Sequence, residues 1–568
     1  MVSKSGCFAI LEQFLADGMH YMFGNPGTSE EGFLDALRAY PDLKYILTLQ
    51  ESVAVMMADG YARATQKPAL VQLHSAPGLG NAIGALYQAM RGHSPLVVIG
   101  GDAGIQYQAM DAQMAADLVA MAEPVTKWAT MVMDAASLLR VVRRAIKIAA
   151  TPPMGPVYVC VPLDILDKPA VEEVRPTAFP STQVIPDPTL LQMAAEMLAS
   201  AHKPMIFVGD GVAFANAQEE LTQVAELLGA EVWEADAGEL NLSHAHPLYQ
   251  GMTGHMFGHQ SLPITAQGDI NLICGTYLLP EVFPELGNIF APGAKTIHID
   301  LDAYEIAKNH PVDLGMIGHP KLTLKRLADE LRGIMTDAQK ASAQARVREL
   351  EATKTSKQKY ELEVDQHLRD EMPIHFSRVA EELAKQLPLD AILFDEALTC
   401  SSALQRYIQP IQAGHYFLTR GGSLGVGIPG AIGMQLAHPD KTVVAVAGDG
   451  GAMYTIQALW SAARHRVNAK FIICNNRSYR LLQLNILAYW QERNLPNHEY
   501  PLSFDLSKPE LHFDQIARSL GVPGIRVEKP DEIAPAIQTA LAEDGPFLID
   551  VVLEGDIRPE MVGIHCGQ

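Results

Sequence analysis

The last third of the chain contains two apolar runs, KTVVAVA and KFIIC, and each ends in a short polar motif. Gly448, Asp449 and Gly450 follow the first run, and Asn475 and Asn476 follow the second, with 24 residues between the motifs. Parallel strands joined by one helix end at the same edge of a sheet. We therefore expect Asp449 and Asn476 to lie close together.

The residue types at this edge are those of a metal-bridged diphosphate site. Carboxylate and amide oxygens are hard ligands that suit Mg²⁺. Gly450 and Gly451 allow backbone amides to approach a diphosphate closely. Each motif alone is also typical of an ordinary turn at a strand end, so the prediction depends on the two occurring together.

Alternating strands and helices must position these motifs. Short apolar runs such as KYILTL and PLVVIGG alternate with helical patterns in residues 1–180, and the same rhythm recurs in 190–340 and 372–568. This alternation predicts the α/β class, with three doubly wound parallel-sheet domains. A Pro-rich segment from Leu166 predicts a linker, and the polar stretch from Asp337 predicts a solvated helical connector.

The composition argues against several classes of protein. The 568 residues include 65 acidic and 43 basic side chains, which makes nucleic acid an unsuitable partner. The sequence has neither an apolar run of membrane-spanning length nor the apolar segment of a signal peptide. Six widely spaced cysteines without a CxxC pair are typical of free thiols. We expect a cytoplasmic enzyme with no membrane partner.

The GDG and NN motifs resemble those of the thiamine diphosphate-dependent decarboxylase and acetohydroxyacid synthase superfamily. The resemblance implies that Asp449 and Asn476 bind Mg²⁺ through side-chain oxygens and that Ser478 binds it through its backbone carbonyl. It also identifies Glu51, in LTLQESVAVMMADGYARAT, as the carboxyl at N1′ of the aminopyrimidine, where it favours the imino tautomer. The ordinary alternative is an acidic residue that opens a helix.

Two further segments match the cofactor site of this superfamily. In TRGGSLGVGIPGAIG, Gly422 matches a backbone carbonyl that contacts the 4′ amino group, and Leu424 matches an apolar wedge that bends the cofactor. Thr399, in DEALTCSS, matches a hydroxyl on the diphosphate, although a helix-capping role explains it too. The implied cofactor-binding residues are Thr399, Gly422, Leu424, Gly448, Asp449, Gly450, Gly451, Asn476 and Ser478. The resemblance makes residues 1–180 the pyrimidine-binding domain, 190–340 the central domain and 372–568 the diphosphate-binding domain.

Motifs in the first domain, FGNPGTSE, LHSAPGLGNA and GHSPLVV, are most similar to benzoylformate decarboxylases. By that similarity Thr28 binds substrate and His74 shuttles protons, although a lone histidine beside a turn is more often structural. The second active-site histidine of those relatives has no counterpart in GTYLLPEVFPELG. If protonation of the intermediate left after CO₂ departs is slow for that reason, carboligation is favoured.

The substrate pocket differs from the pattern of these relatives. Leu481, Leu482 and Asn485 align with positions that shape the pocket. Leu481 replaces a small residue, however, and Asn485 replaces an aromatic one. The specificity for aromatic 2-oxo acids is therefore not carried over to this chain.

The resemblance predicts a thiamine diphosphate- and Mg²⁺-dependent non-oxidative decarboxylase of a 2-oxo acid. It would release an aldehyde or ligate the intermediate to an acceptor aldehyde. An acetolactate synthase-like carboligase and a 2-hydroxyacyl-CoA lyase remain alternatives. The central domain lacks the arginine-containing segment that binds FAD in acetohydroxyacid synthases, which argues against FAD. Because the family builds its site from two subunits, we expect a homodimer or a homotetramer.

Two other patterns suggest different chemistry. GVGIPG, from Gly425 to Gly430, is a literal GxGxxG, so an NAD-dependent dehydrogenase is the alternative from a different class. It follows no clear strand, however. His244, His246, His255 and His259 have a spacing that suits a transition metal, but a polar loop is the favoured interpretation.

Overall fold

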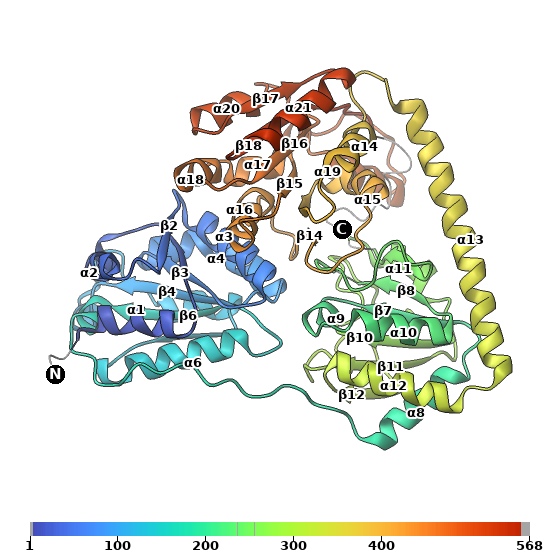
Figure 1. Cartoon of the computed structure of the whole chain (residues 1–568), viewed down its shortest axis with the longest axis horizontal. Helices are drawn as coiled ribbons and strands as arrows, with labels where there is room; N and C mark the ends of the chain where they lie inside the picture. Colours follow the sequence, from blue (N-terminus) through green and yellow to red (C-terminus); the bar gives the residue numbers. More distant parts are fainter. Residues whose placement is uncertain (1–3, 236, 255, 558–568) are drawn as a thin grey trace.

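The structure is a computed structural model that describes residues 4–235, 237–254 and 256–557. It contains three parallel six-stranded sheets, one in each third of the chain (Figure 1). The prediction of three parallel-sheet α/β domains is therefore confirmed. Within the described ranges, no helix has both the length and the apolar character needed to cross a membrane.

The first sheet has the strand order β2-β1-β3-β4-β6-β5. The strands are β1 (Tyr21–Gly24), β2 (Lys44–Leu47), β3 (Ala69–Leu73), β4 (Leu96–Asp102), β5 (Trp128–Met131) and β6 (Val157–Pro162). The helices are α1 (Gly6–Ala16), α2 (Glu31–Ala36), α3 (Glu51–Thr65), α4 (Ser75–Arg91), α5 (Leu118–Ala122), α6 (Leu138–Ala150) and α7 (Leu163–Leu166). Every residue of β3, β4 and β6 is buried, as expected for parallel strands covered on both faces.

The central sheet has the order β12-β11-β10-β7-β8-β9. The strands are β7 (Pro204–Val208), β8 (Glu231–Glu234), β9 (Tyr249–Met252), β10 (Ile270–Cys274), β11 (Lys295–Asp300) and β12 (Leu314–Ile317). The helices are α8 (Pro188–Ala199), α9 (Gly211–Phe214), α10 (Gln218–Leu228), α11 (Gly258–Thr265) and α12 (Pro320–Ile334). Residues 167–187, between α7 and α8, contain neither helix nor strand, which agrees with the predicted linker.

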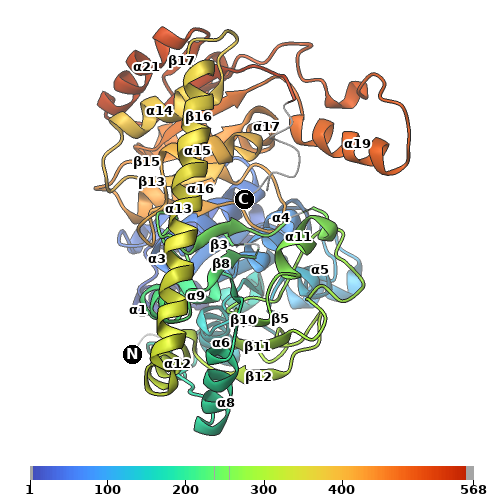
Figure 2. The same ribbon diagram turned by 90° about the vertical axis from the view of Figure 1, so that its right-hand side faces the viewer.

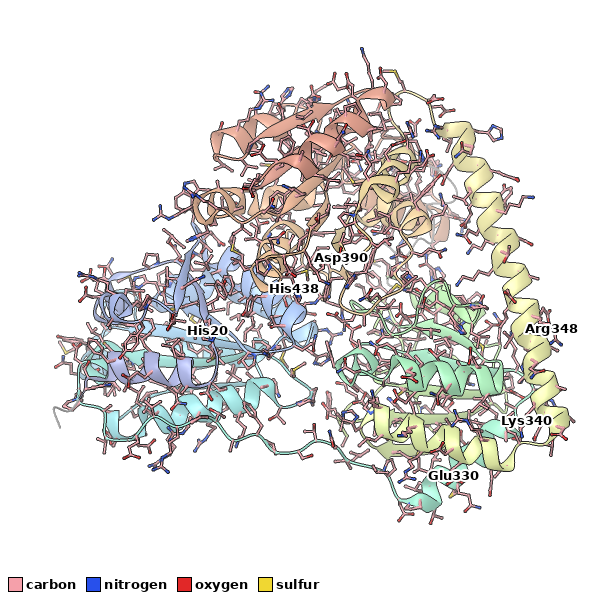
Figure 3. The ribbon with its side chains drawn as sticks, in the orientation of Figure 1. His20, Glu330, Lys340, Arg348, Asp390 and His438 are labelled. Atoms are coloured by element: carbon pink, nitrogen blue, oxygen red, sulfur yellow. The ribbon has the colours of Figure 1, made fainter. Side chains whose placement is uncertain are left out.

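Helix α13 (Asp337–Leu368) connects the central domain to the third domain along one side of the molecule (Figure 2). Lys340 and Arg348 lie on this helix, on the opposite side of the molecule from the first domain (Figure 3). Ala343 and Asp365 are its only buried residues. The predicted solvated helical connector is therefore confirmed, and it begins at the expected residue.

The third sheet has the order β14-β13-β15-β16-β18-β17. The strands are β13 (Ile392–Glu396), β14 (Tyr416–Leu418), β15 (Val443–Gly448), β16 (Lys470–Asn475), β17 (Gly524–Val527) and β18 (Phe547–Val552). The helices are α14 (Phe376–Gln386), α15 (Ser401–Tyr407), α16 (Gly427–Ala437), α17 (Asp449–Thr455), α18 (Ala458–His465), α19 (Arg480–Glu492), α20 (Phe513–Ser519) and α21 (Pro530–Ala542). Strands β15 and β16 are parallel neighbours, with Gly448 opposite Cys474.

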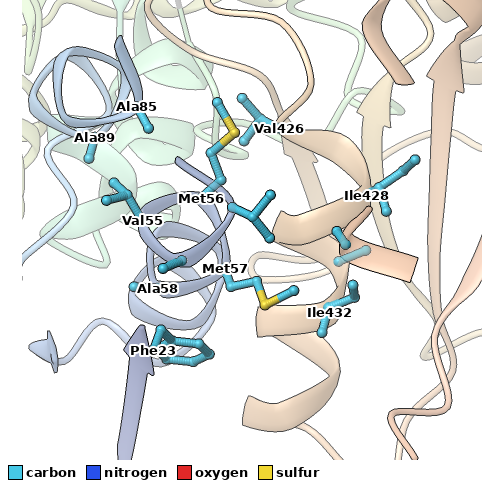
Figure 4. Packing of buried hydrophobic residues seen from close by; sticks show 14 of the residues in the cluster. Phe23, Val55, Met56, Met57, Ala58, Ala85, Ala89, Val426, Ile428 and Ile432 are labelled. Carbon is cyan, nitrogen blue, oxygen red and sulfur yellow. The ribbon is translucent and has the colours of Figure 1, made fainter. Parts of the chain in front are cut away.

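Helices α3 and α16 join the first and third domains. Their apolar side chains, among them Met57 and Ile432, share one buried cluster (Figure 4). A Cβ on Gly60 would lie 2.1 Å from the carbonyl oxygen of Gly430, so the two helix backbones approach too closely for a side chain between them. This close packing fixes the first domain against the third.

Candidate active site

A cavity of about 570 Å³ lies at the carboxyl ends of strands β13, β15 and β16. Ligands of open α/β sheets bind at this edge. Its lining includes all nine predicted cofactor residues: Thr399, Gly422, Leu424, Gly448, Asp449, Gly450, Gly451, Asn476 and Ser478. The structure therefore brings the whole predicted set into one cavity, which we call the Asp449 cavity.

Asp449 and Asn476 turn their oxygens toward the same short turn. Oδ2 of Asp449 accepts a hydrogen bond from the backbone amide of Arg477 at 2.6 Å. Oδ1 of Asn476 accepts one from the amide of Ser478 at 3.0 Å. Burial raises the pKa of the Asp449 carboxyl to about 6, although the backbone amides around it favour the charged form. A cation at this turn would stabilise the buried carboxylate.

Gly422 and Leu424 lie on the loop between β14 and α16, and we call residues 419–425 the cofactor loop. Gly422 has φ +73°, which few other residues adopt, and a Cβ there would meet no atom within 4 Å. It therefore faces open space in the cavity. Sequence reasoning missed Glu396, at the end of β13, which accepts hydrogen bonds from the amides of Gly425 at 2.5 Å and Gly427 at 2.7 Å.

The remaining wall of the Asp449 cavity is largely apolar. Leu481 and Leu482 of helix α19 line it, while Asn485 is outside the lining. The role of Asn485 in the pocket therefore stays a prediction. The central domain contributes Met256 and Val282, which sequence reasoning missed. Val282 belongs to GTYLLPEVFPELG, the stretch that contains no histidine.

Glu51 is the first residue of helix α3, and the side chain of Gln50 caps that helix by accepting hydrogen bonds from two backbone amides. The Glu51 residue is only 7% exposed. The side-chain amide of Asn25 donates to Oε1 at 3.0 Å, and that of Asn81 donates to Oε2 at 2.9 Å. Two donors thus hold this buried carboxyl in one orientation.

His74 lies at the start of helix α4 and is held by a buried glutamate. Its Nδ1 is 3.0 Å from Oε2 of Glu30, and the hydroxyl of Ser29 donates to Oε1 of Glu30 at 2.6 Å. Burial raises the pKa of Glu30, while His74 and Ser29 oppose that rise. Position 27 must be glycine because a Cβ there would lie 2.0 Å from Cγ of His74. Sequence reasoning missed Glu30, which only the FGNPGTSE motif could have indicated.

Thr28 and His74 line a separate cavity of about 160 Å³ in the first domain. Glu51 is close to this group, since a Cβ on Gly78 would be 3.5 Å from both Oε1 of Glu51 and Cβ of His74. None of the described residues of the first domain lines the Asp449 cavity. One chain therefore carries two separate halves of the predicted site.

The GVGIPG run forms the start of helix α16 rather than a dinucleotide site. Both carboxylate oxygens of Glu396 accept hydrogen bonds from backbone amides at Gly425, Val426 and Gly427. A buried carboxylate thus occupies the helix N-terminus that a dinucleotide phosphate would need. This arrangement argues against the dehydrogenase alternative.

The histidine-rich segment forms no metal site among the described residues, where no group of three or more metal-ligating side chains is found. His244 stacks on Tyr249, His246 is 3.3 Å from Glu226, and His259 packs beside Phe257. His255 lies outside the described residues. Cys7, Cys160, Cys274, Cys400 and Cys474 are buried free thiols, and Cys566 also lies outside the described part.

Three family models match successive parts of the chain. Residues 5–121 match the N-terminal TPP binding domain of thiamine pyrophosphate enzymes, 191–327 match the central domain, and 397–551 match the C-terminal TPP binding domain. The chain belongs to the thiamine pyrophosphate enzyme family. Pyrophosphate and diphosphate name the same group, so the matched first and third domains are those that bind thiamine diphosphate.

The chain is similar to proteins named as decarboxylases and to proteins named as acetolactate synthases. The chain is 32% identical to a benzoylformate decarboxylase of Pseudomonas aeruginosa, over 94% of this chain and 96% of that protein. It is 28% identical to a probable acetolactate synthase large subunit of Methanococcus aeolicus, over 98% and 93%. A solved 4-hydroxybenzoylformate decarboxylase of Rhodococcus jostii has TM-score 0.84 and 28% identity, over 97% and 100%. The chain is therefore a thiamine diphosphate-dependent carboxy-lyase or carboligase.

The Asp449 cavity fits the cofactor and a hard cation. Its polar end offers a carboxylate oxygen, an amide oxygen and backbone carbonyls, a donor set that suits Mg²⁺. Gly422 and Gly448 leave open space for a ligand, since a Cβ added to either residue would meet no atom within 4 Å. The other end of the cavity, with Leu424 and Leu481, suits an organic ring and an uncharged substrate side chain.

Proposed function

We propose that the protein uses thiamine diphosphate and Mg²⁺ to decarboxylate a small 2-oxo acid. The product is either a released aldehyde or the ligation product formed with an acceptor aldehyde. The observation that supports this most strongly is the convergence of Asp449 and Asn476 on one turn, in a cavity also lined by Gly422 and Leu424. Relatives named as decarboxylases and as acetolactate synthases support both outcomes.

Residues of the third domain, 372–568, would hold the phosphorylated end of the cofactor. Asp449, Asn476 and the carbonyl of Ser478 would hold Mg²⁺, and backbone amides of Gly450 and Gly451 would approach the diphosphate. The hydroxyl of Thr399 would donate a hydrogen bond to the diphosphate. When bound, the cofactor supplies an acceptor for the electron pair released with CO₂.

Glu51 would hold the proton at N1′ of the aminopyrimidine. The amides of Asn25 and Asn81 keep its carboxyl in place for that task. Because Glu51 does not line the Asp449 cavity of its own chain, we propose that a second copy supplies Glu51 to each Asp449 cavity. The active form would then be a homodimer or a homotetramer built from such dimers.

His74 would move a proton between its Nε2 and the reacting carbon, with Glu30 holding Nδ1. Thr28 would contact the substrate beside it. The central domain contributes Val282 to the wall of the Asp449 cavity, and this side chain cannot donate a proton. Slow protonation on that side would give an acceptor aldehyde time to react, which favours carboligation.

A panel of 2-oxo acids tests this proposal. Each acid is supplied with thiamine diphosphate and Mg²⁺, with and without an aldehyde, and CO₂ and ligated product are both measured. We expect CO₂ release from at least one 2-oxo acid with an uncharged side chain, and its loss in Glu51→Gln. Absence of cofactor-dependent CO₂ release across aliphatic and aromatic acids, in protein that binds the cofactor, would contradict the proposal.

A further inference from the structure

The cofactor loop lies where all three domains meet. Its neighbours along the chain belong to the third domain, yet its side chains and backbone reach the other two. The side chain of Arg420 donates a hydrogen bond to Asp210 of the central domain and another to the backbone carbonyl of Arg91, in the first domain, at 3.2 Å. Domain docking and loop position are therefore linked through one side chain.

Both partners of the Arg420–Asp210 ion pair are almost fully buried, with 8% and 3% exposure. The Asp210 carboxylate also accepts hydrogen bonds from the backbone amides of Gly238 and Glu239 at 3.0 Å. These hydrogen bonds hold the Asp210 carboxylate in place within its own domain. Arg420 is joined to a rigid anchor rather than to a mobile surface acid.

Other contacts hold the rest of the loop. The amide of Ser423 donates to Oε1 of Gln88, on helix α4, at 3.3 Å. The carbonyl of Gly425 accepts a hydrogen bond from the hydroxyl of Thr455 at 2.6 Å. Gly422 and Leu424, which line the cavity, lie between these anchored positions. A small shift of Arg420 would therefore be passed directly to them.

The free energy of burying two charges indicates that the Arg420–Asp210 pair does more than stabilise the fold. Desolvation of two charges offsets most of their attraction, so a buried ion pair often contributes no more stability than a well-packed apolar pair. What such a pair does provide is a defined geometry, because a charge without its partner is costly. That property matters at a loop whose position determines how a cofactor is bent.

We propose that Arg420 is a positioning residue that holds the cofactor loop, and with it Gly422 and Leu424, in the geometry that activates bound thiamine diphosphate. This inference rests on the proposed function for the identity of the cofactor. It adds that correct docking of the central domain is a condition for activation, since Asp210 supplies the anchor.

The test uses Arg420→Met in the full-length protein, with two measurements. In cofactor-free protein, we expect the amides of Ser423 and Gly425 to exchange with solvent deuterium about tenfold faster, while amides of strand β15 are unchanged. In protein saturated with thiamine diphosphate and Mg²⁺, we expect deuterium exchange at C2 of the cofactor to slow about tenfold or more. Arg420→Lys, which keeps the charge, should fold and give a smaller effect on both.

Arg406→Met is the matched control. Arg406 forms a part-buried ion pair with Asp365 at 2.6 Å, between helices α15 and α13, and does not line the Asp449 cavity. It should lower thermal stability without changing protection of the cofactor loop. Unchanged loop protection in folded Arg420→Met would overturn the inference. If the wild-type protein fails to accelerate C2 exchange, the proposed function fails instead, and loop protection still decides the role of Arg420.

Discussion

The Asp449 carboxylate lies 2.6 Å from the backbone amide of Arg477, although the two residues follow different strands. Gly448 and Cys474 are register partners at the ends of β15 and β16, so the polar motifs beyond them meet at the sheet edge. This contact orients Asp449 beside the turn that Asn476 also faces. It is the local basis for the proposed metal site.

Asp449→Ala should abolish Mg²⁺-dependent retention of the cofactor. The substitution removes an oxygen ligand and leaves the cation held by fewer protein groups, so we expect cofactor affinity to fall about 100-fold or more. Titration calorimetry with thiamine diphosphate, in Mg²⁺ and in EDTA, measures this. Asp544→Ala, at an exposed site of the same domain, is the control. Retention equal to wild type in Mg²⁺ would contradict the metal site.

The convergence of Asp449 and Asn476 was predictable because it follows from strand topology. Two parallel neighbouring strands joined by a helical crossover must end at one edge, although the crossover here consists of two helices, α17 and α18, rather than the one expected. Helix α3 was predictable for a different reason. Its apolar spacing and the acidic residue at its first position are local features of the sequence. Local patterns of this kind do not depend on the rest of the chain.

Glu30, Glu396 and Val282 were not predictable because their roles come from tertiary contacts. Glu30 is 44 residues from His74, and Val282 reaches the Asp449 cavity from another domain. In the sequence Glu396 is only the last residue of a strand, and the fold alone brings the amides of Gly425 and Gly427 to it. Apart from the FGNPGTSE motif, which contains Glu30, the sequence carries no signal for these contacts.

Leu481→Ala should admit bulkier 2-oxo acids. Leu481 lines the Asp449 cavity, and its truncation removes most of an apolar side chain from the wall. We expect the ratio of kcat/KM for larger over smaller substrates to rise about tenfold. Gln491→Ala, at an exposed position of the same helix and outside the lining, should leave the ratio unchanged. An unaltered substrate profile in Leu481→Ala would remove this side chain from the pocket.

Glu30→Gln should impair proton transfer while leaving cofactor binding intact. The amide keeps the size of the side chain but removes the charge that holds Nδ1 of His74. We expect kcat to fall about tenfold or more, with a shifted pH profile. Glu31→Gln, at the neighbouring exposed position, is the control. An identical pH profile in Glu30→Gln would leave Glu30 with a purely structural role.

Glu396→Gln should change how stability depends on pH. Burial raises the pKa of Glu396 from its ordinary 4.5 to about 7, so between these values the folded state binds a proton that the unfolded state has lost. The stability present below pH 4.5 is therefore lost as pH rises through 7, by about 1.4 kcal/mol per pH unit. The glutamine of the variant does not titrate, so its stability lacks this pH dependence.

Urea unfolding of the cofactor-free proteins at several pH values measures the difference. Wild type should lose stability relative to Glu396→Gln between pH 4.5 and 7, and the difference should be constant above that range. A difference between the two proteins that does not vary with pH would show that Glu396 titrates at the same pH in both states.

The measurement that tests the central claim most directly is complementation between Glu51→Gln and Asp449→Ala. Each variant alone should be inactive, because every site contains one defect. In co-expressed protein, a mixed dimer has one site with both substitutions and one with neither, so activity should return to roughly a quarter of wild type. Mixed dimers that are present but remain inactive would contradict a site shared between two copies.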